Sequence, residues 1–166
     1  MTTWREAFFQ QAIDENKIRL LLCKERVAYS HQLHYLQMVS EKVAKGFLSQ
    51  FDEHNPPRSS HIAFVALLQI LRRLAADYAG VLGYRMTPKR FAEHIKGLLP
   101  LAHSIQSLAP SIGTGPNPEY PWETDDGNVI APVAHDFSHL EPNSRRMKDL
   151  IELIHQLLRY GANSAT

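Results

Sequence analysis

The chain has 166 residues, the length of one domain and enough to bury a sizeable core without a covalent staple. Its hydrophobic fraction of 44% and charged fraction of 21% exclude wholesale disorder, a collagen-like chain and an isolated coiled coil. The formal net charge of +1 supplies no overall positive field for binding a duplex. We therefore expect a single domain over residues 1–166.

One cysteine, Cys23, excludes a disulfide within the chain and a zinc site made of cysteines alone. Because it follows Leu20 to Leu22, we predict that it is buried like a small apolar residue. No apolar run has the roughly 18–20 residues of a membrane span, and the N-terminus lacks the apolar core of a signal peptide. The sequence therefore predicts a cytoplasmic protein that does not contact membranes.

Apolar residues at helical spacing predict a first helix from about Thr3 to Lys24, with Leu20 to Leu22 on its buried side. Thr3 and Glu6 have the spacing of a capping box, which would satisfy amides at the start of this helix. A second amphipathic helix is predicted from about Ser30 to Phe51, and the prolines at 56 and 57 prevent its continuation.

A third helix is predicted to start near Ser59 or Ser60 and to weaken at Gly80. It is apolar over much of its circumference, which is typical of a central helix and also favours homodimerisation. A fourth helix is predicted to start at Thr87-Pro88 and to continue as far as Pro110.

Residues 110–142 are rich in proline and glycine, yet they contain aromatic and branched apolar residues that a free linker would not carry. We expect an ordered long loop packed on the helices, with a short hairpin around Asp125 to Asn128. A last helix is predicted after Ser144, ending at Gly161. The predicted fold class is all-α, an up-and-down bundle of about five helices with this loop before the last helix.

Several short motifs resemble the HEPN domain family. They are Glu41, Lys42 and Lys45 on the second helix, Ser60-His61 at the start of the third, and Glu119-Tyr120-Pro121-Trp122 before the last. The resemblance implies a helical bundle, often dimeric, that associates with RNA or nucleotides, and some members of the family are ribonuclease toxins. Read from the residues alone, the glutamate and the two lysines would pair with one another on an exposed helix side.

The catalytic signature of that family is an arginine, four to six residues and then a histidine, near the start of a late helix. Such an arginine would hold a phosphate while the histidine transfers a proton. Here the literal match is Arg26 to His31, which lies before the second helix. We take Arg26 and His31 as the candidate catalytic pair, with a surface arginine and an ordinary helix-start histidine as the alternative.

The densest positive sites are Arg72-Arg73 and Arg145-Arg146, which are candidate nucleic-acid-binding residues if the fold brings them onto one face. Otherwise they are solvated helix faces. Two histidine pairs have spacings that metal ligands use, and no metal and no cofactor is predicted. These pairs are His31 with His34 and His135 with His139. The first pair has no evident third ligand, whereas the second would converge with Glu141 if its segment turned helically, which leaves a small-ligand or metal-binding bundle as a third option. Tyr120 and Trp122 either stack on a base or anchor the long loop.

These features together predict an interaction module that binds RNA, a nucleotide or a cognate protein and that self-associates, without an intact catalytic motif. The alternative is a metal-independent ribonuclease of the toxin or defence type that uses an Arg–His pair.

Overall fold

The protein is all-α. The computed structural model describes residues 2–52, 57, 61–109 and 116–163. Within these residues, the helices are α1 (Trp4–Lys24), α2 (Tyr29–Leu48), α3 (Ala63–Arg73), α4 (Ala75–Val81), α5 (Pro88–Gln106) and α6 (Arg145–Asn163). Two short strands, β1 (Trp122–Glu123) and β2 (Val129–Ile130), and two 3-10 turns, η1 (Pro132–Ala134) and η2 (Ser138–Leu140), precede α6. The predicted helical bundle is confirmed.

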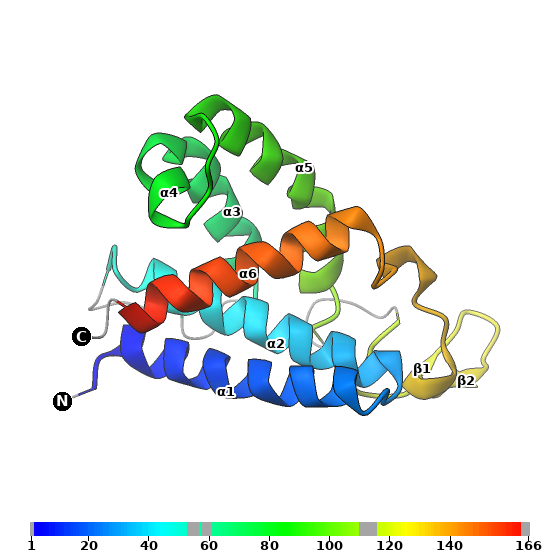
Figure 1. Cartoon of the computed structure of the whole chain (residues 1–166). Coiled ribbons are helices and arrows are strands. Elements are labelled where there is room, and N and C mark those ends of the chain that lie inside the picture. The colour runs from blue at the N-terminus through cyan, green and yellow to red at the C-terminus, as the bar shows by residue number, and fades with distance from the viewer. Residues whose placement is uncertain (1, 53–56, 58–60, 110–115, 164–166) are drawn as a thin grey trace.

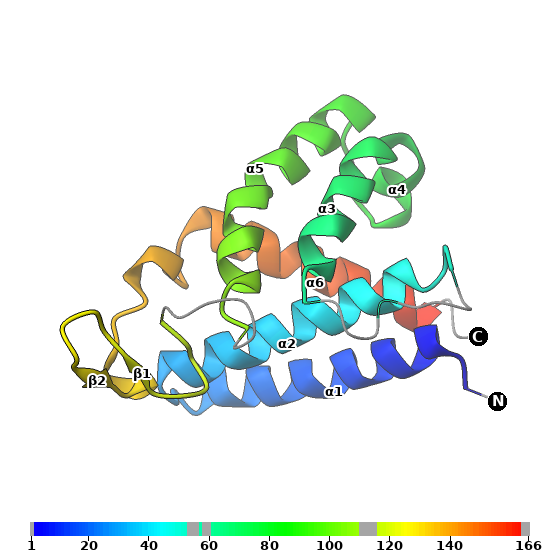
Figure 2. The ribbon, with the colours of Figure 1, turned by 180° about the vertical axis from the view of Figure 1, so that it is seen from behind.

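Helices α1 and α2 lie side by side along their length, and α6 runs across them, as Figures 1 and 2 show from opposite sides. Helices α3, α4 and α5 form a second group beyond α6. Helix α2 contacts α1, α3, α5 and α6, so it is the central element of the bundle. None of the helices, as far as the chain is described, is long and apolar enough to cross a membrane.

The start of α1 follows the predicted capping box. The Thr3 hydroxyl accepts a hydrogen bond from the Glu6 amide, and the Glu6 carboxylate accepts one from the Thr3 amide. After α1, Arg26 adopts a φ of 53°, an unusual backbone conformation for a residue other than glycine, and the chain turns back into α2.

The inward face of α1 differs from the prediction. Residues buried at steps of three and four are Phe9, Ala12, Glu15 and Arg19. Leu20 and Leu21 do not lie on this stripe and are about half exposed, and Cys23 is exposed rather than buried. The prediction that Leu20 to Leu22 lie on the buried side is therefore wrong. The helical periodicity, and not the local hydrophobicity, decides which residues of α1 face α2 and α6.

Four helix boundaries also differ. Helix α5 ends at Gln106 and does not continue to Pro110, because Ser107 caps it and tighter turns follow. Helix α2 ends at Leu48, where Ser49 donates its hydroxyl hydrogen to the Lys45 carbonyl oxygen, and tighter turns follow. The predicted third helix is two helices, α3 and α4, because the backbone of Leu74 leaves the helical region with φ −100° and ψ 36°. The predicted starts of the third helix, Ser59 and Ser60, lie outside the described residues.

The last helix continues through Gly161 to Asn163. Glycine serves packing at this position, because a Cβ atom there would lie 2.1 Å from the ring of Phe9 on α1. The same ring lies 2.9 Å from the position of a Cβ at Gly46 on α2. Phe9 therefore fills the point where α1, α2 and α6 approach most closely, and glycine ends no helix there.

Part of the long loop contacts the bundle within residues 116–142, although Tyr120, Val129 and Val133 are exposed, while 110–115 lie outside the described residues. Its hairpin pairs Trp122 with Ile130 and Glu123 with Val129. Figure 2 shows this hairpin beside the end of the bundle where α1 passes into α2. Trp122 packs against the core, Phe137 and Leu140 are buried, and the hydroxyl of Tyr29 on α2 donates to the Leu140 carbonyl oxygen.

Candidate functional site

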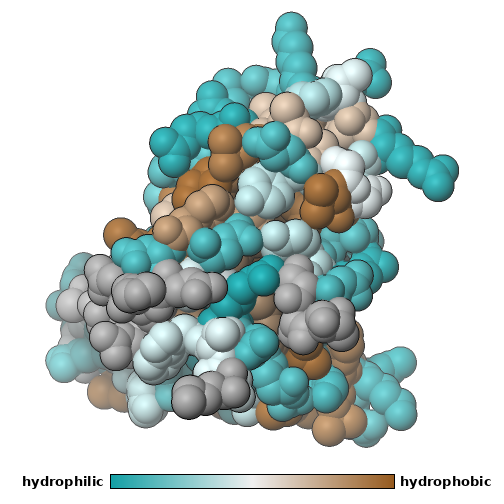
Figure 3. Space-filling model, turned by 90° about the vertical axis from the view of Figure 1, so that its left-hand side faces the viewer, coloured by the Kyte–Doolittle hydropathy of each residue, from teal (hydrophilic) through white to brown (hydrophobic). Residues whose placement is uncertain are grey.

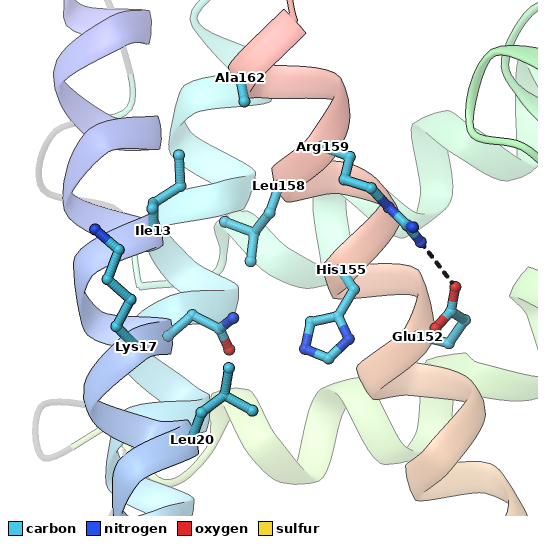
Figure 4. Close-up of a pocket in the computed structure, with 9 residues that line it drawn as sticks. Ile13, Lys17, Leu20, Glu152, His155, Leu158, Arg159 and Ala162 are labelled. Carbon is cyan, nitrogen blue, oxygen red and sulfur yellow. Dashed lines mark hydrogen bonds and ion pairs between the residues drawn. The ribbon is translucent and has the colours of Figure 1, made fainter.

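A groove of about 550 Å³ lies between α1 and α6 (Figure 4). This volume is within the range of small-molecule sites, roughly 300–1,000 Å³. The apolar lining comes from Ile13, Leu20, Leu158 and Ala162, and the polar lining from Asn16, Lys17, Glu152, His155 and Arg159. The groove is thus apolar over much of its wall, with a few polar groups from both helices.

Behind this polar lining lies Arg19, which is only 6% exposed. Its Nε donates to the Asn16 side-chain oxygen at 3.1 Å, and its Nη2 lies 3.3 Å from Nε2 of His155. None of the ion pairs within the described residues involves Arg19. Burial lowers the pKa of this guanidinium, and no carboxylate opposes that effect. A buried cation without an anionic partner is unusual.

The contacts of Arg19 determine what its neighbours can offer a ligand. A guanidinium only donates hydrogen bonds, so Nε2 of His155 accepts and the imidazole is neutral with its proton on Nδ1. Consistently, burial lowers the pKa of His155, and the positive charge of Arg19 lowers it further. The Asn16 oxygen is likewise occupied, which leaves its NH₂ group. Both lining residues therefore have N–H donors to offer.

The rim of the groove carries two cations that are each paired with a carboxylate. Lys17 lies 2.8 Å from Asp14, and Arg159 lies 3.1 Å from Glu152, a pair drawn in Figure 4. All four side chains are more than half exposed. Exposed pairs of this kind contribute little to stability, so either cation can turn to an incoming anion at small cost.

The predicted catalytic residues lie elsewhere. Arg26 is in the turn between α1 and α2, His31 is in the first turn of α2, and both are exposed. Neither lines the α1–α6 groove. Their proposed role in catalysis stays a prediction.

The two arginine pairs are also separated. Arg72 and Arg73 end α3, next to α4, whereas Arg145 and Arg146 begin α6 at the opposite side of the molecule in Figure 1. The second pair lines a smaller pocket of about 250 Å³ between α5 and α6, together with His94. Arg145 is nearly fully exposed and lies 4.0 Å from Asp149. The pairs therefore do not share a pocket.

Three of the residues that carry the HEPN-like resemblance meet, namely Glu41, Lys45 and His61. Glu41 and Lys45 are buried, and they form an ion pair of 2.7 Å along α2. Nδ1 of His61, just before α3, lies 3.2 Å from the second carboxylate oxygen of Glu41. The predicted pairing on an exposed helix side is thus wrong: the pair is buried, and Lys42 instead points to Glu15 on α1 at 3.6 Å.

Two of the other histidines contact residues of the long loop. His34 lies 3.7 Å from Glu119, and the His135 ring packs edge-on against Trp122 and Phe137. This packing anchors the loop through Trp122, while Tyr120 is exposed. Within the parts of the chain that the structure describes, no three potential metal ligands cluster.

Comparison of this chain with protein-family models, curated proteins and solved structures gives no match. The candidate site therefore rests on geometry. Sequence reasoning missed the pairing of Arg19 with His155, which are 136 positions apart. The sequence contained one indication of this site. Arg19 has the same helical spacing as the buried residues Phe9 and Ala12, so this spacing places a charged side chain on the buried face of α1.

Proposed function

We propose that this protein is an HEPN-like interaction module that binds a phosphate-bearing ligand, a nucleotide or single-stranded RNA, in the α1–α6 groove. The observation that carries this proposal is the buried, carboxylate-free Arg19 that holds both His155 and Asn16. An anion that reaches these N–H donors supplies the charge that the buried guanidinium lacks.

The groove suits the two chemical parts of a nucleotide. Its apolar walls, which include Leu20 and Leu158, offer a surface for a base. The N–H groups of His155 and Asn16, with Lys17 and Arg159 at the rim, offer donors to a phosphate. A net charge of +1 and separated arginine pairs favour a short ligand over a duplex, because few phosphates are neutralised.

A binding titration tests this proposal. The probes are a fluorescent adenosine monophosphate, a single-stranded RNA oligomer and inorganic phosphate, each with wild-type protein and with Arg19→Met. We expect the substitution to weaken nucleotide binding at least about tenfold, because a charge-assisted hydrogen-bond network is lost. Free phosphate should bind more weakly than the nucleotide, because it cannot use the apolar walls.

The matched control is Arg85→Met, which removes an exposed arginine outside the groove. It should leave all three affinities unchanged. Equal affinity of wild-type and Arg19→Met for the nucleotide and the RNA, or failure of every probe to bind, would contradict the proposal.

The second candidate function is a metal-independent ribonuclease, favoured by the 3.3 Å separation of Arg19 and His155. In the observed arrangement Nε2 of His155 accepts from Arg19, so its lone pair is not available to remove a proton. Binding without cleavage therefore has the stronger support. Incubation with RNA under chelation separates the two, and His155→Ala and His31→Ala show which histidine any cleavage uses.

We also propose self-association in the cytoplasm. The outer side of α1 leaves Ile18 and Leu21 exposed, whereas most of α3, the helix that first suggested a dimer, is covered. Figure 3 shows another face, at the end of the molecule that carries the termini, where hydrophobic and hydrophilic residues are interspersed. Sedimentation of wild-type and Leu21→Gln at micromolar concentration tests this, and a monomeric wild-type mass would contradict it.

A further inference from the structure

A second histidine, His61, has the opposite kind of partner from His155. Its Nδ1 lies 3.2 Å from a carboxylate oxygen of Glu41, and its side chain is 42% exposed. An ionised carboxylate only accepts hydrogen bonds, so the imidazole proton is on Nδ1. The lone pair is then on Nε2, the nitrogen that Glu41 does not engage.

Glu41 is itself held in place and held ionised. Lys45 donates to one carboxylate oxygen at 2.7 Å, and Gln37 donates to the other at 3.1 Å. Burial alone would raise the pKa of Glu41, but its hydrogen bonds with Lys45 and His61 outweigh burial and lower it. The carboxylate therefore fixes the tautomer and the orientation of His61 before any ligand arrives.

A carboxylate that orients an imidazole is a common way to prepare a nucleophilic or basic nitrogen. The two lysines beside Glu41 add no net positive charge, because Lys45 pairs with Glu41 and Lys42 pairs with Glu15. The choice of reactant therefore rests on the Glu41 carboxylate, which stabilises the imidazolium that forms when Nε2 of His61 attacks phosphorus.

We propose that Nε2 of His61 is a phosphoryl-acceptor site, with Glu41 as its positioning residue. The donor is an anionic phosphoryl compound of the phosphoramidate or acyl-phosphate class. This proposal concerns α2 and the residue just before α3, neither of which lines the groove, and it stands independently of the ligand bound there.

The step balances with a phosphoramidate donor in its monoanionic form, in which the nitrogen is protonated. The Nε2 lone pair forms a bond to phosphorus, the P–N bond of the donor breaks, and ammonia leaves with that electron pair. The imidazole keeps its Nδ1 proton and becomes cationic beside Glu41. The product is a phosphohistidine whose ring charge is balanced by the carboxylate and whose phosphoryl group faces solvent.

Incubation of the full chain with phosphoramidate tests the proposal. Intact mass and peptide mapping should show one acid-labile phosphoryl group on His61 in the wild type and none there in His61→Ala. His103→Ala removes another exposed histidine and should leave the labelling rate of His61 unchanged. Labelling that is equal in His61→Ala, or that occurs at other histidines at the same rate, would overturn the proposal.

Two further measurements test whether Glu41 positions His61, namely the labelling rate of a Glu41 variant and the tautomer of His61. Glu41→Gln should reduce the labelling rate of His61 roughly tenfold, because an uncharged amide stabilises the developing imidazolium less well. Nitrogen NMR of the wild type should find His61 as the Nδ1–H tautomer at neutral pH. An Nε2–H tautomer in the wild type would overturn the assignment even if the Glu41 variant failed to fold.

Discussion

Two regions of the molecule place a histidine against buried charges of opposite sign. Between α1 and α6, His155 accepts a hydrogen bond from the Arg19 guanidinium, and its remaining ring nitrogen is a donor. Between α2 and the start of α3, His61 donates to the Glu41 carboxylate, and its remaining nitrogen is an acceptor. The two imidazoles therefore present opposite groups, an N–H donor at His155 and a lone pair at His61. The charge of the buried neighbour determines which group is presented.

The two regions also differ in how their buried charge is balanced. Glu41 has Lys45 at 2.7 Å, so the charge of that region is neutralised within α2. Arg19 has only neutral partners in the described chain, namely Asn16, His155 and the Cys23 sulfur. We expect the balanced region to be important for stability and the unbalanced one to be sensitive to ligands.

The largest expected effect is the loss of folding stability when the buried pair of Glu41 and Lys45 is broken. Glu41→Ala removes the buried carboxylate that pairs with Lys45 at 2.7 Å, and breaking a buried pair in this way costs about 3–5 kcal/mol. Urea unfolding followed by circular dichroism measures the change in the free energy of unfolding.

The matched control is Glu152→Ala, which breaks the exposed pair with Arg159 at the groove rim. Its expected cost is below about 1 kcal/mol, because water screens an exposed pair. If the two variants lost equal stability, the distinction between a buried and a solvated pair would be wrong.

A second prediction separates the two histidines by moving one helix. Gly161→Ala places a methyl group against the Phe9 ring, where a Cβ has only 2.1 Å of room, so α6 must shift from α1. Overpacking of this kind costs about 1–3 kcal/mol. The NMR signals of His155 should move strongly, while those of His61 stay nearly unchanged.

Gly97→Ala in α5 is the control, because no atom of the described residues lies within 4 Å of its Cβ position, apart from the backbone of its own helix and its chain neighbours. It should be neutral or stabilise the helix by up to about 1 kcal/mol, since alanine has the higher helix propensity. Equal destabilisation by both substitutions would show that helix propensity, and not the close approach at Phe9, governs these positions.

The parts of the fold set by local chemistry were predictable from the sequence. The Thr3 capping box, the Thr87-Pro88 helix start and the hairpin around Gly127 are all present, because each depends on residues a few positions apart. The fold class followed from the apolar stripes of α2 and α6 in the same way.

The features that depend on tertiary neighbours were not predictable. The last helix does not end at Gly161, because whether a glycine ends a helix or admits a ring depends on Phe9, more than 150 positions away. The Arg–His pair of the structure joins α1 to α6, whereas the sequence pattern Arg26 to His31 joins neighbours in one turn. The Glu41 motif was visible in the sequence, but its burial was not.

The smallest expected effect is the pH dependence contributed by His155. Burial and Arg19 lower its pKa from the ordinary value of 6.5, so the unfolded chain binds this proton more readily than the folded one. The stability that the neutral imidazole contributes is therefore complete above pH 6.5 and is lost as the pH falls through the lower folded pKa. His155→Gln, which keeps an acceptor for Arg19, should remove this component from the difference between unfolding curves at pH 7.5 and pH 5.5.

Ligand binding should act on the same titration. A bound phosphate favours the protonated imidazole and so raises the pKa of His155, which reduces the loss of stability in mild acid. NMR titration of His155 with and without adenosine monophosphate measures this shift directly. A folded pKa above 6.5 in the free protein would mean that Arg19 does not donate to this ring in solution. The contrast between His155 and His61 would then be wrong, because Nε2 of both rings would be free of a hydrogen bond from the protein.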